Sequence, residues 1–215
     1  MQERRQFSLL DRCFDQLNQA LDVTLGRTPA AQRPYPAEGE SRPEYDEAQR
    51  RHIAGLMRIN HAGEVCAQAL YSGQAITARS PEVQVAMNQA AVEELDHLAW
   101  CADCLAELND RPSRLGLFWY GGSFFLGCVA GAIGDRWNLG FLEETERQVE
   151  AHLAHHLEDI PQADGRTRAI VEQMKIDEAH HAQMAADAGA AKLPNPVPNL
   201  MAITAKGMKA LAYRF

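Results

Sequence analysis

The fold is decided by two segments that share a Glu-x-x-His pattern, Glu94-Leu95-Asp96-His97 and Glu178-Ala179-His180-His181. Residues three apart lie on one face of an α-helix, so each segment directs one carboxylate and one imidazole the same way. Helical bundles that bind two metal ions use two such units and add one glutamate from each of two further helices. The pattern therefore predicts an all-α four-helix bundle, and it requires two more glutamates.

Two glutamates lie at the spacing that such a bundle needs. Glu64 precedes Glu94 by 30 residues, and Glu146 precedes Glu178 by 32 residues. Turn signals lie near both midpoints: Ser80-Pro81 in the first interval, and Pro161 with Asp164-Gly165 in the second. Helix arms of about 12–14 residues rise roughly 18–21 Å on each side of a turn, so the paired glutamates come level. We therefore expect two helical hairpins, each carrying Glu, turn and Glu-x-x-His.

Four carboxylates that face one core need a balancing charge. A lone Glu-x-x-His is most often part of a solvated helix face, but two units at matched spacing argue against that reading. Buried and unpaired, each carboxylate would cost several kcal/mol, whereas two divalent cations cancel the charge of all four. Oxygen and nitrogen donors without a thiolate suit iron or manganese better than a structural zinc. The expected ligands are Glu64, Glu94, His97, Glu146, Glu178 and His181.

Composition limits the classes of partner. The chain has 215 residues, enough for one good-sized domain, and its net charge is −8, from 21 basic and 29 acidic residues. No basic stripe appears, so nucleic acid is not expected as a partner. Five irregularly spaced cysteines argue against a disulfide framework and favour a reducing cytosol. The N-terminal residues lack the apolar core of a signal peptide.

We expect three regions along the chain. Residues 1–26 predict an amphipathic helix, from about Phe7 to Leu25, and residues 27–46 form a proline-rich linker that is extended or mobile. Residues 47–215 form the bundle domain, with a short terminal helix after the prolines at 194, 196 and 198. The four main helices are expected near 47–78, 82–109, 138–158 and 166–188.

An apolar insert interrupts this domain. Residues 115–134 contain no charged side chain and are long enough to cross a membrane, but they include six glycines, which weaken a continuous span. Three interpretations stay open: a buried connecting helix, a surface that dips into one leaflet, and a true span. A true span would place the two hairpins on opposite sides of the membrane, where they could not share a metal site.

Four strings carry a family resemblance: Asn60-His61-Ala62-Gly63-Glu64, Glu93-Glu94-Leu95-Asp96-His97, Gly140-Phe141 through Glu144-Thr145-Glu146, and Asp177-Glu178-Ala179-His180-His181. From about Met57 to the C-terminus the chain resembles the demethoxyubiquinone hydroxylase family, a membrane-associated branch of the ferritin-like di-iron carboxylate proteins. The resemblance implies O2-dependent hydroxylation of the ring of a polyprenylated demethoxyubiquinol in ubiquinone biosynthesis.

The resemblance also implies a cofactor arrangement. One iron would be held by Glu64, Glu94 and His97, the other by Glu146, Glu178 and His181, with Glu94 and Glu178 bridging the two. NADH is the expected reductant, although no Gly-x-Gly-x-x-Gly motif occurs and residues that bind it are not identified. The expected location is the cytoplasmic face of the cell membrane, as a peripheral protein bound to one leaflet. A homo-oligomer or a complex of biosynthetic proteins is an open expectation.

Further residues are candidates near the centre. Glu93 and Asp177 each precede a ligand glutamate and are expected to orient a metal-bound imidazole, or else to be exposed acids. His152 resembles a family histidine near the site, whereas His155, His156 and His180 are expected on solvated faces. Cys101 and Cys104 extend the stripe of Glu94 and are expected inside, as small core residues rather than a zinc or redox pair.

Other functions stay open beside hydroxylation of a quinol. The main alternative is a ferritin-like iron-binding or storage protein without hydroxylase activity. A hydroxylase of RNA or of a carrier-bound chain is opposed by the acidic charge, and a purely structural bundle would not need four inward carboxylates. The apolar insert favours the quinol hydroxylase, because a soluble storage shell has no use for it.

Overall fold

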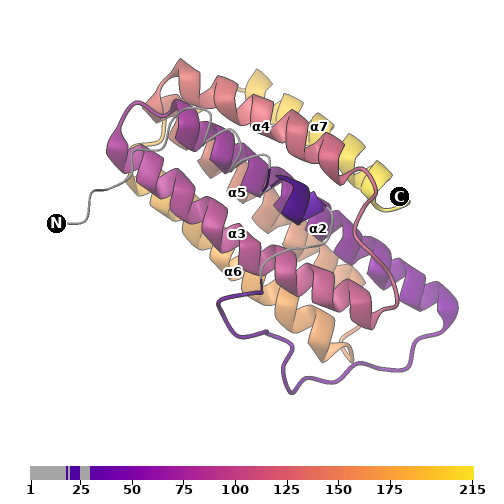
Figure 1. Cartoon of the computed structure of the whole chain (residues 1–215). Helices are drawn as coiled ribbons and strands as arrows, with labels where there is room; N and C mark the ends of the chain where they lie inside the picture. Colours follow the sequence, from indigo (N-terminus) through magenta and orange to yellow (C-terminus); the bar gives the residue numbers. More distant parts are fainter. Residues whose placement is uncertain (1–17, 19, 25–29) are drawn as a thin grey trace.

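The computed structural model describes residue 18, residues 20–24 and residues 30–215 (Figure 1). Every regular element among these residues is a helix, so the prediction of an all-α fold is confirmed. Most of the predicted N-terminal amphipathic helix lies outside the described residues. Its described part, residues 20–24, is helical, and Ala20 and Val23 are buried in an apolar cluster that includes residues of the bundle.

Four long helices form the bundle: α2 (Glu47–Thr77), α3 (Pro81–Glu107), α5 (Asp135–Asp159) and α6 (Gly165–Asp187). All four lie within three residues of their predicted bounds. In Figure 1 the α2–α3 hairpin lies beside the α5–α6 hairpin. The terminal helix α7 (Pro196–Ala212) was expected after all three prolines, but it begins at Pro196 and includes Pro198, because the first turn of a helix tolerates proline. One end of the bundle is filled by a core between the hairpins, which includes Met57, Trp100, Leu153 and Met174.

The turns use the signals expected from the sequence. Ser80 caps α3, because its hydroxyl accepts hydrogen bonds from the amides of Glu82 and Val83, and Pro81 occupies the first helical turn. Asp164 caps α6 by accepting from the amide of Thr167 at 3.0 Å. These caps satisfy amide groups that a helix leaves without partners, and they set the length of each hairpin.

The apolar insert forms α4 (Gly116–Ile133), which connects α3 to α5 and packs along α2. Two of its glycines, Gly127 and Gly131, form the contact with α2, and Gly134 ends the helix. A Cβ built at Gly127 would lie 2.1 Å from the carbonyl oxygen of Leu70, and one at Gly73 of α2 would lie 2.3 Å from that of Phe124. The backbones therefore approach more closely than any larger residue would allow.

The outer face of α4 is apolar and exposed. Only 28% of the helix is buried, so the interpretation as a buried connecting helix is wrong, although the helix does connect the two hairpins. It is the one described helix long and apolar enough to cross a membrane. Because α4 packs lengthwise on α2, which carries charged residues, it could not span a bilayer without drawing α2 in.

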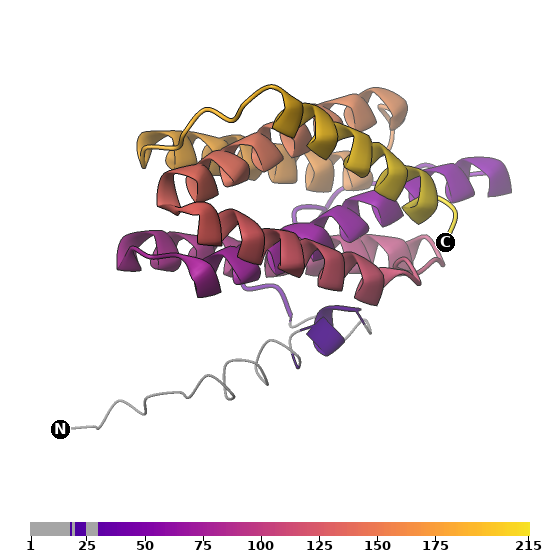
Figure 2. The same cartoon turned by 90° about the horizontal axis from the view of Figure 1, so that it is seen from above.

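Two apolar surfaces lie on the same side of the bundle. In Figure 2, α4 and α7 lie over α2 and α5, away from α3 and α6. The exposed side chains of α4 are Leu117, Phe118, Phe125, Leu126, Val129 and Ile133, and those of α7 are Leu200, Ile203 and Leu211. Phe124, by contrast, is partly buried against the cluster that contains Val65 and Leu98. We call these exposed residues of α4 and α7 the apolar face.

The described part of the proline-rich linker is irregular and is bonded to the bundle. Arg42 forms ion pairs with Glu107 at 3.1 Å and with Asp164 at 3.4 Å, and Tyr45 donates a hydrogen bond to Asp164 at 2.7 Å. Arg166 of α6 donates to the backbone oxygens of Ala37 and Glu40 at 3.0 Å each. Residues 30–46 are therefore held against the bundle, with a turn at residues 36–39 inside the segment.

Candidate metal centre

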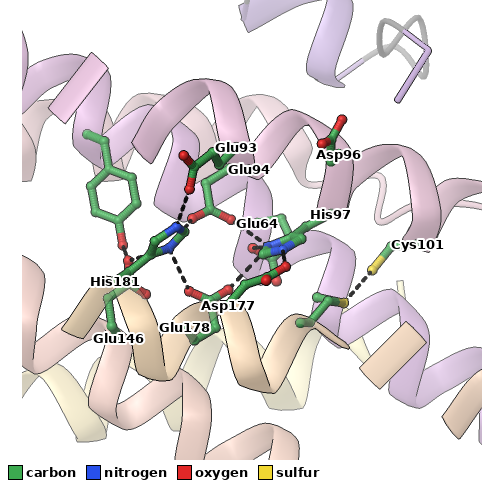
Figure 3. A network of polar contacts seen from close by, with 12 residues as sticks. Glu64, Glu93, Glu94, Asp96, His97, Cys101, Glu146, Asp177, Glu178 and His181 are labelled. Carbon is green, nitrogen blue, oxygen red and sulfur yellow. Dashed lines mark hydrogen bonds and ion pairs between the residues drawn. The ribbon is translucent and has the colours of Figure 1, made fainter. Parts of the chain in front are cut away.

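Six predicted ligands meet inside the bundle, from four different helices (Figure 3). The level of each residue follows from hairpin length, and its direction from the helical period. None of the six is more than 2% exposed. They are Glu64 of α2, Glu94 and His97 of α3, Glu146 of α5, and Glu178 and His181 of α6.

The six residues form two overlapping groups. Potential ligand atoms of Glu64, Glu94, His97 and Glu178 all lie within 4.8 Å of one another, and so do those of Glu94, Glu146, Glu178 and His181. Glu94 and Glu178 belong to both groups. A carboxylate with one oxygen in each group has the geometry of a bridge between two ions.

Several buried oxygen and nitrogen atoms that could bind a metal ion at this centre have no hydrogen-bond partner. They are Oε1 of Glu94, Oε2 of Glu146, Oε2 of Glu178 and Nδ1 of His181. Buried polar atoms are normally paired, and unpaired ones cost free energy. Cations between the two groups would satisfy these atoms and balance the four carboxylates. The donor set of oxygen and imidazole nitrogen therefore fits a pair of iron ions.

Without cations, the buried carboxylates of this cluster repel one another, and their pKa values reflect it. Burial raises the pKa values of Glu64 and Glu146 well above the usual range, and the carboxylates of Glu94 and Glu178 raise them further. Burial also opposes ionisation of Glu178, but the nearby imidazoles of His181 and His97 outweigh it and lower its pKa. Without cations, the raised pKa values of Glu64 and Glu146 favour their protonated, neutral forms, and this reduces the repulsion among the carboxylates.

The two imidazoles respond to the same carboxylates. Burial would lower the pKa of His181, but the nearby carboxylates of Glu178 and Glu94 raise it to about 9. The pKa of His97 is likewise raised well above its usual value, because surrounding carboxylates outweigh burial. Metal binding requires a free lone pair on each ring, so it must release these protons.

Each imidazole is oriented by an acid on the opposite helix. The Nε2 atom of His97 lies 2.9 Å from Asp177 of α6, and that of His181 lies 2.5 Å from Glu93 of α3. The Nδ1 atoms face the carboxylate cluster, with His97 at 3.0 Å from Glu94 and His181 at 3.5 Å from Glu178. An Nε2–H held in this way leaves the Nδ1 lone pair directed at the ion position.

Sequence reasoning missed two residues at the centre. The hydroxyl of Tyr71, which is fully buried, donates to Glu146. Tyr71 follows Glu64 by two helical turns, so its spacing could have revealed it. Arg33 forms ion pairs with Asp96 at 2.9 Å and Asp177 at 2.8 Å. No local pattern marked Arg33, because it lies in the proline-rich segment.

The remaining candidate histidines lie outside both groups of donors. His152 faces α7, where its Nδ1 lies 3.4 Å from Nζ of Lys209, and its ring lies 3.9 Å from that of His156. The expectation that His156 is solvated is wrong, since it is 3% exposed, whereas His155 and His180 are exposed. Burial lowers the pKa of His156 to about 4 and, with the charge of His156, that of His152 to about 2.

Both cysteines of the Cys-x-x-Cys segment face inward, as predicted. Cys101 and Cys104 are fully buried, and Cys101 donates a weak hydrogen bond to the sulfur of Met174 at 3.8 Å. Burial raises the pKa of both thiols, that of Cys104 to about 11. Neither belongs to a group of three or more candidate metal ligands among the described residues. They are core residues.

A four-helix bundle with four buried carboxylates, two imidazoles and two shared glutamates has the architecture of the ferritin-like di-iron carboxylate proteins. Residues 51–212 match the family described as ubiquinone biosynthesis protein COQ7. The chain belongs to this family.

Several relatives support the assignment over nearly the whole chain. A protein of Xanthomonas oryzae pv. oryzae (strain PXO99A), named 3-demethoxyubiquinol 3-hydroxylase, is 56% identical over 210 residues, which cover 98% of this chain and 96% of the relative. A protein of the same name from Xanthomonas campestris pv. campestris (strain 8004) is 56% identical over 98% of this chain and 97% of its own length. A third, from Polynucleobacter asymbioticus, is 52% identical over 96% of this chain and 99% of its own length.

Proposed function

We propose that this chain is a monooxygenase that hydroxylates the ring of a polyprenylated demethoxyubiquinol in ubiquinone biosynthesis. The observation that carries the proposal is that Glu94 and Glu178 each belong to both donor groups of a buried centre. Similarity to hydroxylases over almost the full length supports the same reaction and does not favour the alternative of iron storage.

The proposed centre holds two irons. Glu64, Glu94 and His97 would hold one, and Glu146, Glu178 and His181 would hold the other, with Glu94 and Glu178 shared between the two. When bound and reduced, the irons would supply the activation of O2. Support comes from the burial of all six residues and from the unpaired donor atoms that point into the centre.

The overall reaction fixes the electron count. One oxygen atom of O2 enters a ring C–H bond as a hydroxyl group, and the other leaves as water after taking up two electrons and two protons. We propose NADH as the source of the electrons, with the quinone ring as the intermediary. This assignment rests on the family resemblance, because the sequence contains no dinucleotide-binding glycine motif.

The protein's own residues hold the ligands in place and exclude water. Asp177 and Glu93 orient the two imidazoles, and Tyr71 restrains Glu146. Packing around the centre leaves the six ligands almost without solvent contact, which strengthens every electrostatic interaction there. We assign no direct role to His152, which faces Lys209 instead of the carboxylates.

A polyprenyl quinol is dissolved in the bilayer, so the enzyme must meet it there. We propose that the apolar face of α4 and α7 binds one leaflet as a peripheral contact, on the cytoplasmic face of the cell membrane. Support comes from Phe118 and Phe125, which are 68% and 67% exposed, and from the position of both helices on one side of the bundle (Figure 2). Large exposed apolar surfaces mark interaction sites.

The proposed organisation keeps residues 47–215 as the catalytic domain, with α4 as its membrane-facing part. Residues 1–26 and 27–46 precede it as an amphipathic helix and a linker. Contacts of residues 30–46 with α3 and α6 support treating this part of the linker as an extension of the domain. A homo-oligomer, or assembly with other biosynthetic proteins, would have to leave the apolar face free.

The proposal is tested by loading the purified protein with iron and measuring NADH oxidation with a short-chain demethoxyquinone. We expect about two irons per chain, oxidation that depends on the quinone, and a product heavier by one oxygen atom. Iron without turnover would favour storage, and absence of bound iron would contradict the assignment of the centre.

A further inference from the structure

The surroundings of the two imidazoles follow one repeated pattern. On α3, Gln89 donates to Glu93 at 3.0 Å, and Glu93 lies next to ligand Glu94. On α6, Gln173 donates to Asp177 at 2.9 Å, and Asp177 lies next to ligand Glu178. Each helix thus carries a glutamine, an acid four residues later, and a Glu-x-x-His unit that begins directly after the acid. Each acid contacts the histidine of the other helix.

The repeat is broken at one point. The acid is a glutamate on α3 and the shorter aspartate on α6. Among the described residues, only the aspartate forms an ion pair with an arginine, Arg33, whose Nη1 donates to it at 2.8 Å. Glu93 is also the more exposed acid, with 34% of its side chain accessible against 15% for Asp177.

Arg33 is itself firmly held. Its Nε donates to Asp96 at 2.9 Å, and the other oxygen of Asp96 accepts from the amide of Gln32 at 2.6 Å. Its guanidinium carbon lies 4.6 Å from the ring centroid of Trp100, a buried residue whose ring is 5.4 Å from that of His97. Two carboxylates and one aromatic face therefore fix the guanidinium group.

A cation bound at Nδ1 of His97 would select one tautomer of the ring, with the proton on Nε2. Asp177 accepts from Nε2–H, which leaves the Nδ1 lone pair for a cation. Arg33 Nη2 lies 3.2 Å from the same nitrogen, but a guanidinium only donates, so this is a contact rather than a second hydrogen bond. The arginine therefore acts on His97 through Asp177.

We infer that Arg33 is a positioning residue for the His97 half of the metal centre. It holds Asp177 against His97 Nε2, and so makes metal binding in this half depend on a residue of the segment before the bundle. In the His181 half, the orienting acid Glu93 feels only the more distant charge of Arg33, because the guanidinium group contacts Asp96, Asp177 and His97 instead. The match to the family begins at residue 51, so Arg33 lies outside the matched residues.

The inference rests on the proposed two-metal centre, and metal binding tests it without turnover. Metal-free full-length protein is titrated with Co²⁺ by calorimetry and visible absorption. We expect the wild type to bind two ions. In Arg33→Gln one ion should bind at least about tenfold more weakly, with a change in one set of cobalt bands only, because groups that orient metal ligands commonly contribute 10–100-fold to affinity.

Three further variants separate positioning from general loosening. Arg166→Gln removes contacts that hold the same segment but touches neither imidazole, and should bind both ions as the wild type does. Glu93→Gln should weaken one ion, and the Arg33→Gln/Glu93→Gln double variant should weaken both. Arg33→Lys should recover part of the loss, because one ammonium can pair with Asp177 but cannot reproduce the two-carboxylate bridge.

The outcomes are distinct. The inference is overturned if Arg33→Gln binds both ions like the wild type, if it weakens both equally, or if Arg166→Gln gives the same defect. Thermal unfolding of each variant shows whether the fold is intact, and Arg33→Lys provides the test if the glutamine variant does not fold. A wild type that binds fewer than two ions would instead overturn the two-metal proposal itself.

Discussion

Tyr71 of α2 donates a hydrogen bond to Glu146 of α5, and both side chains are fully buried. This contact joins the first helix of one hairpin to the first helix of the other, inside the centre. It gives one oxygen of Glu146 a fixed partner, while the other oxygen has none. The carboxylate is therefore oriented before any cation arrives.

Tyr71→Phe removes the hydroxyl and keeps the ring. The oxygen of Glu146 then loses its donor, which for a hydrogen bond to a charged group costs about 1.5–3 kcal/mol. We expect a lower free energy of unfolding for the metal-loaded protein and weaker retention of one iron, measured by urea unfolding and chelator competition. Unchanged values for both quantities would remove Tyr71 from the centre.

Glu178→Ala removes a carboxylate that belongs to both donor groups. We expect loss of both irons and of activity, because each ion loses a ligand. Glu64→Ala should affect one ion more than the other, since Glu64 belongs to a single group. Iron per chain, measured after desalting, compares the two. The control is Glu172→Ala, at an exposed position of α6, the helix that carries Glu178.

Metal binding should weaken as the pH falls. Without metal, the raised pKa of His181, about 9, keeps its imidazole protonated at neutral pH, so a cation must displace that proton. Between pH 6 and 8, the apparent affinity should rise with pH, and adding Fe²⁺ without oxygen should release protons into a weakly buffered solution. A pH-independent affinity would contradict the charge assignment of the centre.

Close packing of α4 on α2 predicts opposite effects at two glycines. Gly127→Ala would place a methyl group against the carbonyl of Leu70, and should destabilise the protein by about 1–3 kcal/mol as α4 moves outward. A Cβ at Gly122 meets nothing within 4 Å, so Gly122→Ala should be neutral or stabilise by up to about 1 kcal/mol. Urea unfolding measures both. Equal effects would argue against this packing.

The apolar face predicts a defect in membrane binding without a defect in folding. Burying each phenylalanine in the membrane interface contributes about 1.5–3 kcal/mol, so Phe118→Asp with Phe125→Asp should reduce liposome binding by at least about 100-fold. Val85→Asp, on α3 and 63% exposed, should bind like the wild type. Cosedimentation with anionic and neutral vesicles is the measurement. Equal binding by both variants would rule out this face.

The convergence of the six candidate ligands could be predicted because it depends on local periodicity. Residues three apart share a helix face, and hairpin length alone brings Glu64 level with Glu94, so pattern and turn position carried the information. Arg33 could not be found in this way. It reaches Asp177 across 144 positions, from a segment with no period of its own.

The apolar insert shows a different limit. Its composition predicted a hydrophobic surface, but it did not show why the segment contains so many glycines, since glycine weakens isolated helices. Only the approach of Gly127 to Leu70 reveals that they allow two backbones to pack closely. Burial of His156 was likewise unpredictable, because it depends on how α5 meets α7 and not on sequence spacing.

The most direct test of the central claim is isotopic. Iron-loaded protein is incubated with a short-chain demethoxyquinone, NADH and ¹⁸O2, and the product is analysed by mass spectrometry. The two-iron assignment predicts one ¹⁸O atom in the new ring hydroxyl, and no product from Glu178→Ala. Oxygen taken from water, or hydroxylation that survives in Glu178→Ala, would contradict it.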